Sequence, residues 1–287
     1  MNCRVLLAQI EPTLGNLSAN LEMHLAEIEN ARKRGIEVVL FPELSLSGYF
    51  LRDQVSEVAL PREHPILSEL CERSRGVSIG AGFVERGSDG RLYNSFGFFE
   101  DGRLVDVHRK VHLVTYGMFD DARDFAPGER FRAVESKHGR FGILICEDMW
   151  HVSAAYLHFI SNVDALIVPS SSPGRGVSDE GEQGLRSVRT WNRMQDALAL
   201  LFQTWIVYVN RVGSEDGVLF SGGSRVVDPF GREAGALPPL EVGQLEVTLS
   251  GDTLRRARIT TPLRRDEKPW LVQRELARLL EEQGTAR

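Results

Sequence analysis

Apolar residues recur along this chain at two spacings, one typical of strands and one typical of helices. Residues 3–10 and 36–41 are short, largely apolar runs of strand length. Between them, apolar residues recur every three or four positions from Leu17 to Ile28, and Asn16 precedes them as a helix N-cap. The same criteria predict helices at 65–75, 153–161, 185–202 and 269–282, and strands at 77–84, 94–100, 103–107, 131–134, 141–146, 165–168, 206–210, 223–227, 232–235 and 244–249.

The predicted strands are joined in two ways. Some form hairpins, as around Asp101-Gly102, and others are separated by helices. This mixture predicts a layered α/β domain rather than an all-parallel sheet. Because no low-complexity linker interrupts the chain, we expect one domain over residues 1–265. A C-terminal helical tail over residues 266–287 is expected to pack on the domain or on a partner subunit.

Composition excludes several classes of function. The chain of 287 residues is 42% hydrophobic and 26% charged, which is ordinary for a globular protein. Its net charge of −6 gives no electrostatic reason to expect nucleic acid or a membrane as a partner. No apolar run is long enough for a transmembrane helix, and the N-terminus enters a strand without a signal peptide. We therefore expect a cytoplasmic protein in which Cys3 and Cys71 are buried structural residues.

Cys146 is the strongest candidate for a chemically active residue. It ends the apolar run 141–146 and is followed at once by Glu147 and Asp148. A thiol at the carboxyl end of a strand lies at the rim of a sheet rather than deep in a core. A nearby cation or base would lower its pKa and supply a useful thiolate. These features favour a nucleophile.

Two other predicted strand ends carry groups that complement a thiol. Glu43 follows an apolar strand and Pro42, where partial desolvation would raise its pKa toward that of a general base. Lys110 follows a further strand and could stabilise a thiolate or an oxyanion. A protease-like pair of Cys146 with His112 or His151 is an alternative, but Glu43 accounts for more of the pattern.

These segments resemble the three motifs of the nitrilase, or carbon–nitrogen hydrolase, superfamily, and the resemblance extends over nearly the whole chain. It implies an α/β fold of the four-layer αββα sandwich type with mixed sheets. It also implies no metal or organic cofactor, and a homodimer or higher homo-oligomer. The motifs that carry it are Phe41-Pro42-Glu43-Leu44-Ser45-Leu46-Ser47-Gly48-Tyr49, His108-Arg109-Lys110-Val111-His112-Leu113 and Gly142-Ile143-Leu144-Ile145-Cys146-Glu147-Asp148.

The resemblance assigns a role to each catalytic candidate. Glu43 becomes the general base, Lys110 the oxyanion-stabilising cation and Cys146 the nucleophile, with the backbone N–H of Glu147 as a second oxyanion donor. A further acidic residue supports this set in the family. Asp121 stands there in place of the expected glutamate, so its shorter side chain leaves its role open.

Within the superfamily, the chain most resembles the glutaminase domain of glutamine-dependent NAD synthetases. It contains no Ser-Gly-Gly-x-Asp-Ser loop of a synthetase domain, because Ser221-Gly222-Gly223-Ser224 lacks the aspartate and is read as a hairpin. Residues 170–173 read Ser-Ser-Ser-Pro where that branch has Asn-Ala-Ser-Pro. The expected substrate-binding residues are Tyr49, Tyr116, Glu147, Trp150 and Ser172.

Two further motifs are set aside. His108 and His112 have metal-ligand spacing, but Arg109 occupies the place of a zincin glutamate, and the segment is predicted to be a strand end. Gly80-Ala81-Gly82 resembles part of a dinucleotide-binding motif, but its third glycine is replaced by a glutamate. We expect neither a metal nor a nucleotide at these positions.

We therefore expect an amidohydrolase that cleaves a small carboxamide through a cysteine thioester and releases ammonia. A glutaminase subunit that supplies ammonia to a separate synthetase is the alternative. A catalytically silent binding protein is a third reading, which the combination of Glu43, Lys110 and Cys146 argues against. The identity of the amide is left open by the sequence.

Overall fold

The computed structural model describes residues 1–176 and 184–285. Within these residues the strands form two six-stranded mixed sheets and one two-stranded hairpin. The first sheet has the order β14 (Gly243–Ser250), β1 (Asn2–Gln9), β2 (Val38–Leu40), β3 (Ser78–Arg86), β4 (Leu92–Glu100) and β5 (Arg103–Arg109). The second has the order β13 (Glu233–Ala236), β12 (Arg225–Val227), β9 (Trp205–Asn210), β8 (Ala165–Ser170), β7 (Gly139–Ile143) and β6 (Ala133–Ser136), and the hairpin joins β10 (Ser214–Glu215) to β11 (Val218–Leu219).

Each large sheet has three parallel strands at its centre. They are β1, β2 and β3 in the first sheet and β7, β8 and β9 in the second, and antiparallel strands flank both sets. This arrangement confirms the prediction of a layered α/β domain with mixed sheets. It also places the carboxyl ends of the parallel strands of one sheet together, where loops can carry functional residues.

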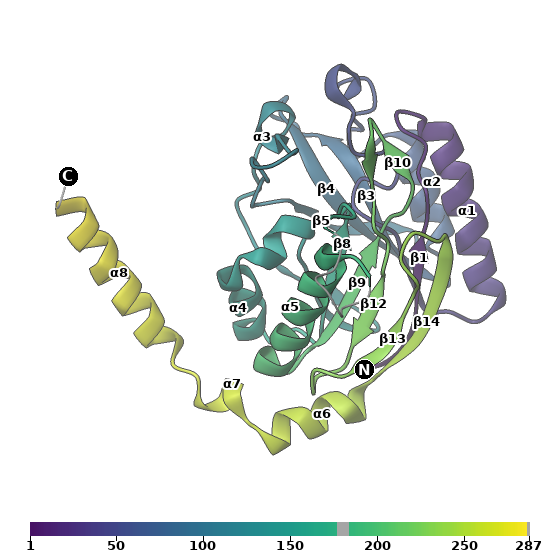
Figure 1. Ribbon diagram of the computed structural model, residues 1–287. Helices are drawn as coiled ribbons and strands as arrows, with labels where there is room; N and C mark the ends of the chain where they lie inside the picture. The colour runs from purple at the N-terminus through teal and green to yellow at the C-terminus, as the bar shows by residue number, and fades with distance from the viewer. Residues whose placement is uncertain (177–183, 286–287) are drawn as a thin grey trace.

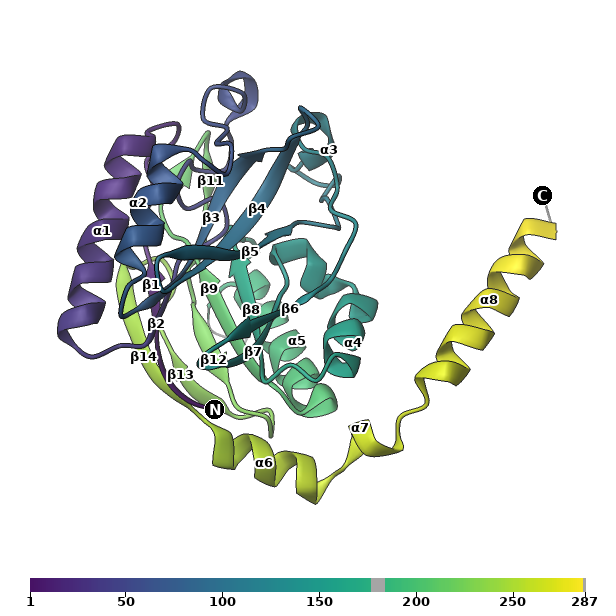
Figure 2. The ribbon, with the colours of Figure 1, turned by 180° about the vertical axis from the view of Figure 1, so that it is seen from behind.

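The two sheets face each other, and helices cover their outer faces (Figures 1 and 2). Helices α1 (Leu17–Lys33) and α2 (Pro65–Arg73) pack on the first sheet, and α4 (Val152–Ile160) and α5 (Arg186–Phe202) pack on the second. The resulting order of layers is the expected αββα sandwich. The remaining helices are η1 (Arg52–Gln54), α3 (Asp121–Asp124), η2 (Cys146–Trp150), α6 (Gly251–Thr260), α7 (Leu263–Asp266) and α8 (Pro269–Thr285).

Alternation along the central strands explains the four layers. In β1, Val5 and Leu7 join the core between the sheets, whereas Leu6 and Ala8 join the core beneath α1 and α2. Successive side chains of a strand point to opposite faces, so an unbroken apolar strand needs cover on both sides. Each fully buried aliphatic side chain contributes about 1.5–3 kcal/mol to stability. The cores thus fix the position of the two sheets relative to each other, and with it the position of the loops at their ends.

Several local features differ from the sequence-based prediction, among them the short helices η1, α3 and α7, which were not predicted. Strand β7 ends at Ile143, not at Cys146, because the backbone turns there into the short helix η2. Helix α6 was not predicted, since its mostly polar residues bury only Leu254 and Ala257. The two-residue ladder of the β10–β11 hairpin was also missed, because it is too short to produce an alternating pattern.

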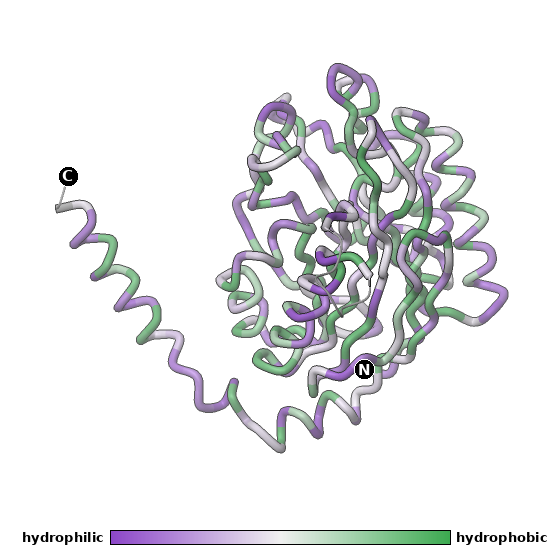
Figure 3. Tube along the Cα trace, in the orientation of Figure 1, coloured by the Kyte–Doolittle hydropathy of each residue, from purple (hydrophilic) through white to green (hydrophobic). Residues whose placement is uncertain are grey.

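The C-terminal helix α8 projects away from the sandwich (Figure 1). Along it, apolar and polar residues alternate in short segments (Figure 3). Among the described residues, no helix combines the length and apolar character needed to cross a membrane. The division into a domain of residues 1–265 and a tail, and the cytoplasmic location, stay predictions.

Candidate active site

The three predicted catalytic residues follow strand ends that meet between the two sheets. Glu43 lies shortly after β2 and Lys110 directly after β5, two strands that run in the same direction within the first sheet. Cys146 comes after β7 of the second sheet. The facing loops touch where Ser171, just after β8, donates its backbone N–H to the Glu43 carboxylate at 2.8 Å. The site therefore spans the interface between the sheets.

Glu43 is buried and held on both carboxylate oxygens. Its Oε1 accepts hydrogen bonds from Lys110 Nζ and Asn94 Nδ2, both at 2.8 Å, and its Oε2 accepts the bond from Ser171. The loop can lie this close to the sheet because Gly82 has no side chain. A Cβ there would come within 2.3 Å of the backbone N of Leu44. Burial raises the pKa of Glu43, although Lys110 partly opposes this effect.

Lys110 lies completely buried between two carboxylates. Its Nζ donates to Glu43 Oε1 and to Asp121 Oδ2, both at 2.8 Å, and the Tyr49 hydroxyl donates to the other Asp121 oxygen at 2.6 Å. Burial alone would lower the pKa of Lys110, but the neighbouring Asp121 and Glu43 outweigh it and raise that pKa well above its ordinary value. The ammonium is thus charged and fixed in position. The shorter side chain of Asp121 still reaches Lys110. The backbone N–H of Asp121, where α3 begins, donates to the carbonyl of Val114 at 2.9 Å and ties this backbone to the segment that follows Lys110.

Cys146 has a left-handed backbone conformation, with φ of +46°. Non-glycine residues seldom adopt this region, and such strain persists only where the surroundings impose it. Burial and the nearby Glu43 raise the pKa of the Cys146 thiol well above its ordinary value, and the cation of Lys110 does not offset them. The expectation of a lowered thiol pKa was therefore wrong. Cys146 is a neutral thiol at rest that needs a base, and Glu43 is a nearby group with raised basicity.

Asp148 joins the turn at Cys146 to the segment at the end of β5. Its role was not predicted from the sequence. Asp148 is fully buried and accepts backbone N–H bonds from Ile145 at 3.1 Å and from His112 at 2.8 Å. The rings of His108 and His112 also lie within hydrogen-bond distance, at 3.0 and 3.1 Å. Both histidines of the His108-x-x-x-His112 motif therefore contact Asp148.

A cavity of about 280 Å³ opens onto Cys146. The Tyr116 hydroxyl bonds to Glu147 at 3.0 Å on its wall, and Trp191 Nε1 donates to Ser172 Oγ at 2.7 Å. All five predicted substrate-binding residues line the cavity, whereas Glu43, Lys110 and Asp121 lie buried beside it. The lining residues are Tyr49, Val114, Tyr116, Phe119, Cys146, Glu147, Trp150, Ser172, Pro173, Arg175, Arg186, Ser187, Thr190 and Trp191.

Several residues of the site were missed from the sequence. Asn94 and Ser171 hold Glu43, and Trp191 fixes Ser172. Asn94 lies within a strand and Trp191 within a helix, where local pattern indicates only burial. Ser171 lies beside Ser172 in the segment 170–173, which the motif comparison already covers. Of these three residues, it is the one that the sequence could have indicated.

Comparisons with known proteins agree with this geometry. The sequence profile described as "Carbon-nitrogen hydrolase" matches residues 4–259. The chain belongs to the carbon–nitrogen hydrolase family. This confirms the resemblance drawn from the motifs and supports a hydrolase.

The individual relatives of the chain include proteins of two kinds. A glutamine-dependent NAD(+) synthetase of Thermotoga maritima is 33% identical over 267 residues, which cover 91% of this chain and 44% of that protein. The structure of a glutamine-dependent NAD+ synthetase from Acinetobacter baumannii has a TM-score of 0.78 at 29% identity, covering 88% of this chain and 47% of the other. Saccharomyces cerevisiae Nit3, of the nitrilase superfamily, has a TM-score of 0.77 at 26% identity, covering 91% and 95%.

The coverage limits what these relatives imply. The chain spans less than half the length of the NAD synthetases that it matches. It matches nearly the full length of the Nit3 chain. Family membership and fold are therefore established for this chain.

Proposed function

We propose that the protein hydrolyses the terminal amide of a small carboxamide to a carboxylic acid and ammonia. One observation carries this proposal: the neutral thiol of Cys146 opens onto a cavity beside the buried, hydrogen-bonded Glu43, Lys110 and Asp121. A nucleophile, a base and a group that stabilises the oxyanion are what covalent cleavage of an amide requires, and Lys110 can be that third group.

In the acylation step, Cys146 Sγ bonds to the amide carbon as its proton passes to the Glu43 carboxylate. The carbonyl oxygen becomes an oxyanion, which the ammonium of Lys110 and the backbone N–H of Glu147 stabilise. Glu43 then returns the proton to the nitrogen as the C–N bond breaks, so ammonia leaves and a thioester remains. Water attacks the thioester, Glu43 accepts its proton, and the acid and the thiol are regenerated.

The walls of the cavity favour an α-amino acid amide such as glutamine. Glu147 presents a carboxylate that can pair with an α-ammonium group. Arg175 and Arg186 lie on the same cavity, where they can pair with an α-carboxylate. A cavity of about 280 Å³ is suited to a small molecule rather than a chain.

The first experiment measures ammonia release from glutamine, asparagine, simple amides, N-carbamoyl amino acids and nitriles. We expect release from amides, with glutamine preferred. Cys146→Ala should lower the rate by at least about 10⁴-fold, and Glu43→Gln by about 10²–10⁴-fold. Cys71→Ala is the matched control and should keep full activity. Absence of release from every compound, or an active Cys146→Ala variant, would contradict the proposal.

The alternative is a glutaminase subunit that transfers ammonia to a separate synthetase. The similarity to glutamine-dependent NAD synthetases over less than half of their length favours it. In that case the isolated chain would hydrolyse glutamine slowly, and adding an ammonia-using NAD synthetase would accelerate it. A rate that is high alone and unchanged by the synthetase favours the independent amidase. Because the proposed reaction needs a reduced thiol, we also propose a reducing, cytoplasmic location.

A further inference from the structure

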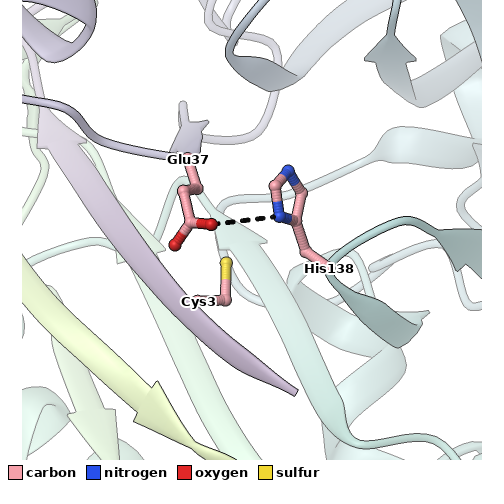
Figure 4. Close-up of side chains that lie close together, drawn as sticks. All are labelled: Cys3, Glu37 and His138. Carbon is pink, nitrogen blue, oxygen red and sulfur yellow. Dashed lines mark ion pairs between the residues drawn. The ribbon is translucent and has the colours of Figure 1, made fainter.

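A second group of chemically reactive side chains lies at the opposite ends of the strands. Cys3 is near the start of β1, Glu37 directly precedes β2, and His138 directly precedes β7. Figure 4 shows the three side chains converging, with the Cys3 sulfur beside the Glu37 carboxylate and the His138 ring. The catalytic residues follow the carboxyl ends of β2 and β7, so this cluster is separate from the proposed active site.

The donor atoms are close enough to share one ion. One ligand atom from each residue, a thiol sulfur, a carboxylate oxygen and an imidazole nitrogen, lies within 4.8 Å of the other two. His138 Nδ1 and Glu37 Oε1 are 3.7 Å apart, too far for a hydrogen bond. In tetrahedral zinc sites, bonds of about 2.0–2.3 Å place neighbouring ligand atoms roughly 3.3–3.7 Å apart. Small side-chain adjustments would therefore complete three ligand positions.

The other side of the His138 ring also has the surroundings of a metal ligand. His138 Nε2 is buried, has no hydrogen-bond partner among the described residues, and lies 4.0 Å from Glu100 Oε2. Glu100 is itself held by Ser78 Oγ at 2.8 Å and Ser136 Oγ at 2.7 Å. Metal-binding histidines commonly direct their second nitrogen to a carboxylate, which orients the ring. Glu100 is placed to take that role.

The charges of the cluster favour a cation. Two carboxylates, those of Glu37 and Glu100, lie 3.7 and 4.0 Å from the ring nitrogens of His138. Two basic side chains adjacent in sequence to the cluster pair elsewhere, Arg4 with Glu246 and Lys137 with Asp101.

We propose that Cys3, Glu37 and His138 bind a Zn²⁺ ion that links the two sheets of the sandwich, with Glu100 orienting His138. On binding, Cys3 releases its thiol proton to solvent and coordinates as a thiolate, and water takes the fourth position. β1 and β2 belong to one sheet and the β6–β7 turn to the other, so the ion would fasten the sheets at their amino-terminal edge. The site is independent of the proposed hydrolysis.

The test uses the full chain in a Cys146→Ala background, which removes the other reactive thiol. After chelation and dialysis, we expect one equivalent of Zn²⁺ to bind and the melting temperature to rise. Co²⁺ as a probe should give the thiolate charge-transfer absorption of a cysteine ligand. Cys3→Ser and His138→Gln should weaken Zn²⁺ binding by more than about 100-fold, and Glu100→Gln by about 10–100-fold. Cys71→Ser is the matched control and should bind as the parent does.

The outcomes separate the proposal from chance proximity. If the parent binds no stoichiometric Zn²⁺, or if His138→Gln binds it as tightly as the parent, the proposal is overturned. His138 lies in a turn, so that variant is expected to fold even if Cys3→Ser, in the core, does not. Circular dichroism of each variant in the metal-free state checks folding separately from binding. Activity is not used as the readout, so a failure of the proposed hydrolysis would leave this result interpretable.

Discussion

Asp121 shows at the scale of one residue how backbone position compensates for side-chain length. The family resemblance leads one to expect a glutamate at this position, and the aspartate is one methylene shorter. It nevertheless contacts both Lys110 Nζ at 2.8 Å and the Tyr49 hydroxyl at 2.6 Å. Its negative charge also contributes to the raised pKa of Glu43, after burial. Asp121 therefore fixes the cation and tunes the base.

Replacing Asp121 by asparagine should change the pH dependence of the reaction. Glu43 must be deprotonated to act as a base, so its raised pKa sets an acid limb above the ordinary glutamate range. Removing the negative charge of Asp121 lowers the pKa of Glu43, and the limb moves to lower pH. The maximal rate should fall by about 10–100-fold, because Lys110 loses a partner that positions it.

The pH profile of kcat/KM for ammonia release measures this effect. Asp124→Asn, at the other end of α3, is the matched control and should leave the limb in place. If the acid limb of Asp121→Asn stays fixed or moves to higher pH, the assignment of Glu43 as the general base is contradicted.

Glu147 should govern recognition of a charged substrate. It is held by Tyr116 on the cavity wall, and burial raises its pKa. We expect Glu147→Gln to raise KM for glutamine by about 10-fold or more, since a charge-assisted bond contributes about 1.5–3 kcal/mol. KM for an uncharged amide of similar size should change little. An equal rise in KM for both substrates would indicate that Glu147 shapes the cavity and does not bind the ammonium group.

At the scale of elements, the turn after β7 and the end of β5 behave as one unit. Asp148 joins them through backbone N–H groups on both sides and the rings of His108 and His112. Burial would raise the pKa of Asp148, but these hydrogen bonds outweigh it and hold the pKa well below its ordinary range. The unit joins the segment that carries Cys146 to the segment that carries Lys110.

Asp148→Asn should destabilise the protein by about 2–4 kcal/mol at neutral pH, because it weakens charge-assisted bonds to a buried site. A depressed folded-state pKa means that the stabilisation is fully present above the unfolded pKa of about 3.9 and is lost as the pH falls below it. The difference between the parent and the variant should therefore shrink in acid.

Urea unfolding between about pH 7 and pH 3 tests this expectation, with the exposed Asp252→Asn as the control. A stability difference that is independent of pH would show that the charge of Asp148 is not what holds the turn.

Local patterns predicted most elements, and the exceptions have physical causes. The strands and the helices α1, α2, α4 and α5 bury apolar faces with regular periods, which a sequence displays directly. Strand β7 ended earlier than predicted because the left-handed Cys146 is imposed by packing and by Asp148, not by local propensity. Helix α6 escaped detection because tertiary contacts stabilise a segment with little periodicity.

At the scale of the whole molecule, the sandwich has an uncovered apolar surface near its C-terminus. Helix α8 projects from the body (Figure 2). Its large apolar side chains are exposed. A groove of about 480 Å³ lies where its base meets α5, between Leu201, Phe202 and Leu271. We propose that a second copy of the chain covers this surface, in line with the homodimer that the family resemblance implies. The exposed apolar residues of α8 are Trp270, Val272, Leu276, Leu279 and Leu280.

Light scattering should then give twice the mass of one chain. Leu276→Glu together with Leu280→Glu should shift the protein to monomers, because two charges would enter an apolar interface. Arg75→Glu, an exposed residue outside this surface, is the control and should stay dimeric. A monomeric parent at micromolar concentration, or a dimer that survives the double substitution, contradicts the proposed interface.

The sequence by itself determined the layered α/β class, the family and the identity of the residues at the strand ends. It could do so because periodicity and short motifs are local properties of the chain. Only the tertiary structure decided which of those residues contact each other and how their pKa values shift. Burial makes Cys146 a neutral thiol rather than a thiolate, and Asp121 reaches Lys110. Desolvation and distances between residues far apart in the chain arise only when the two sheets pack together.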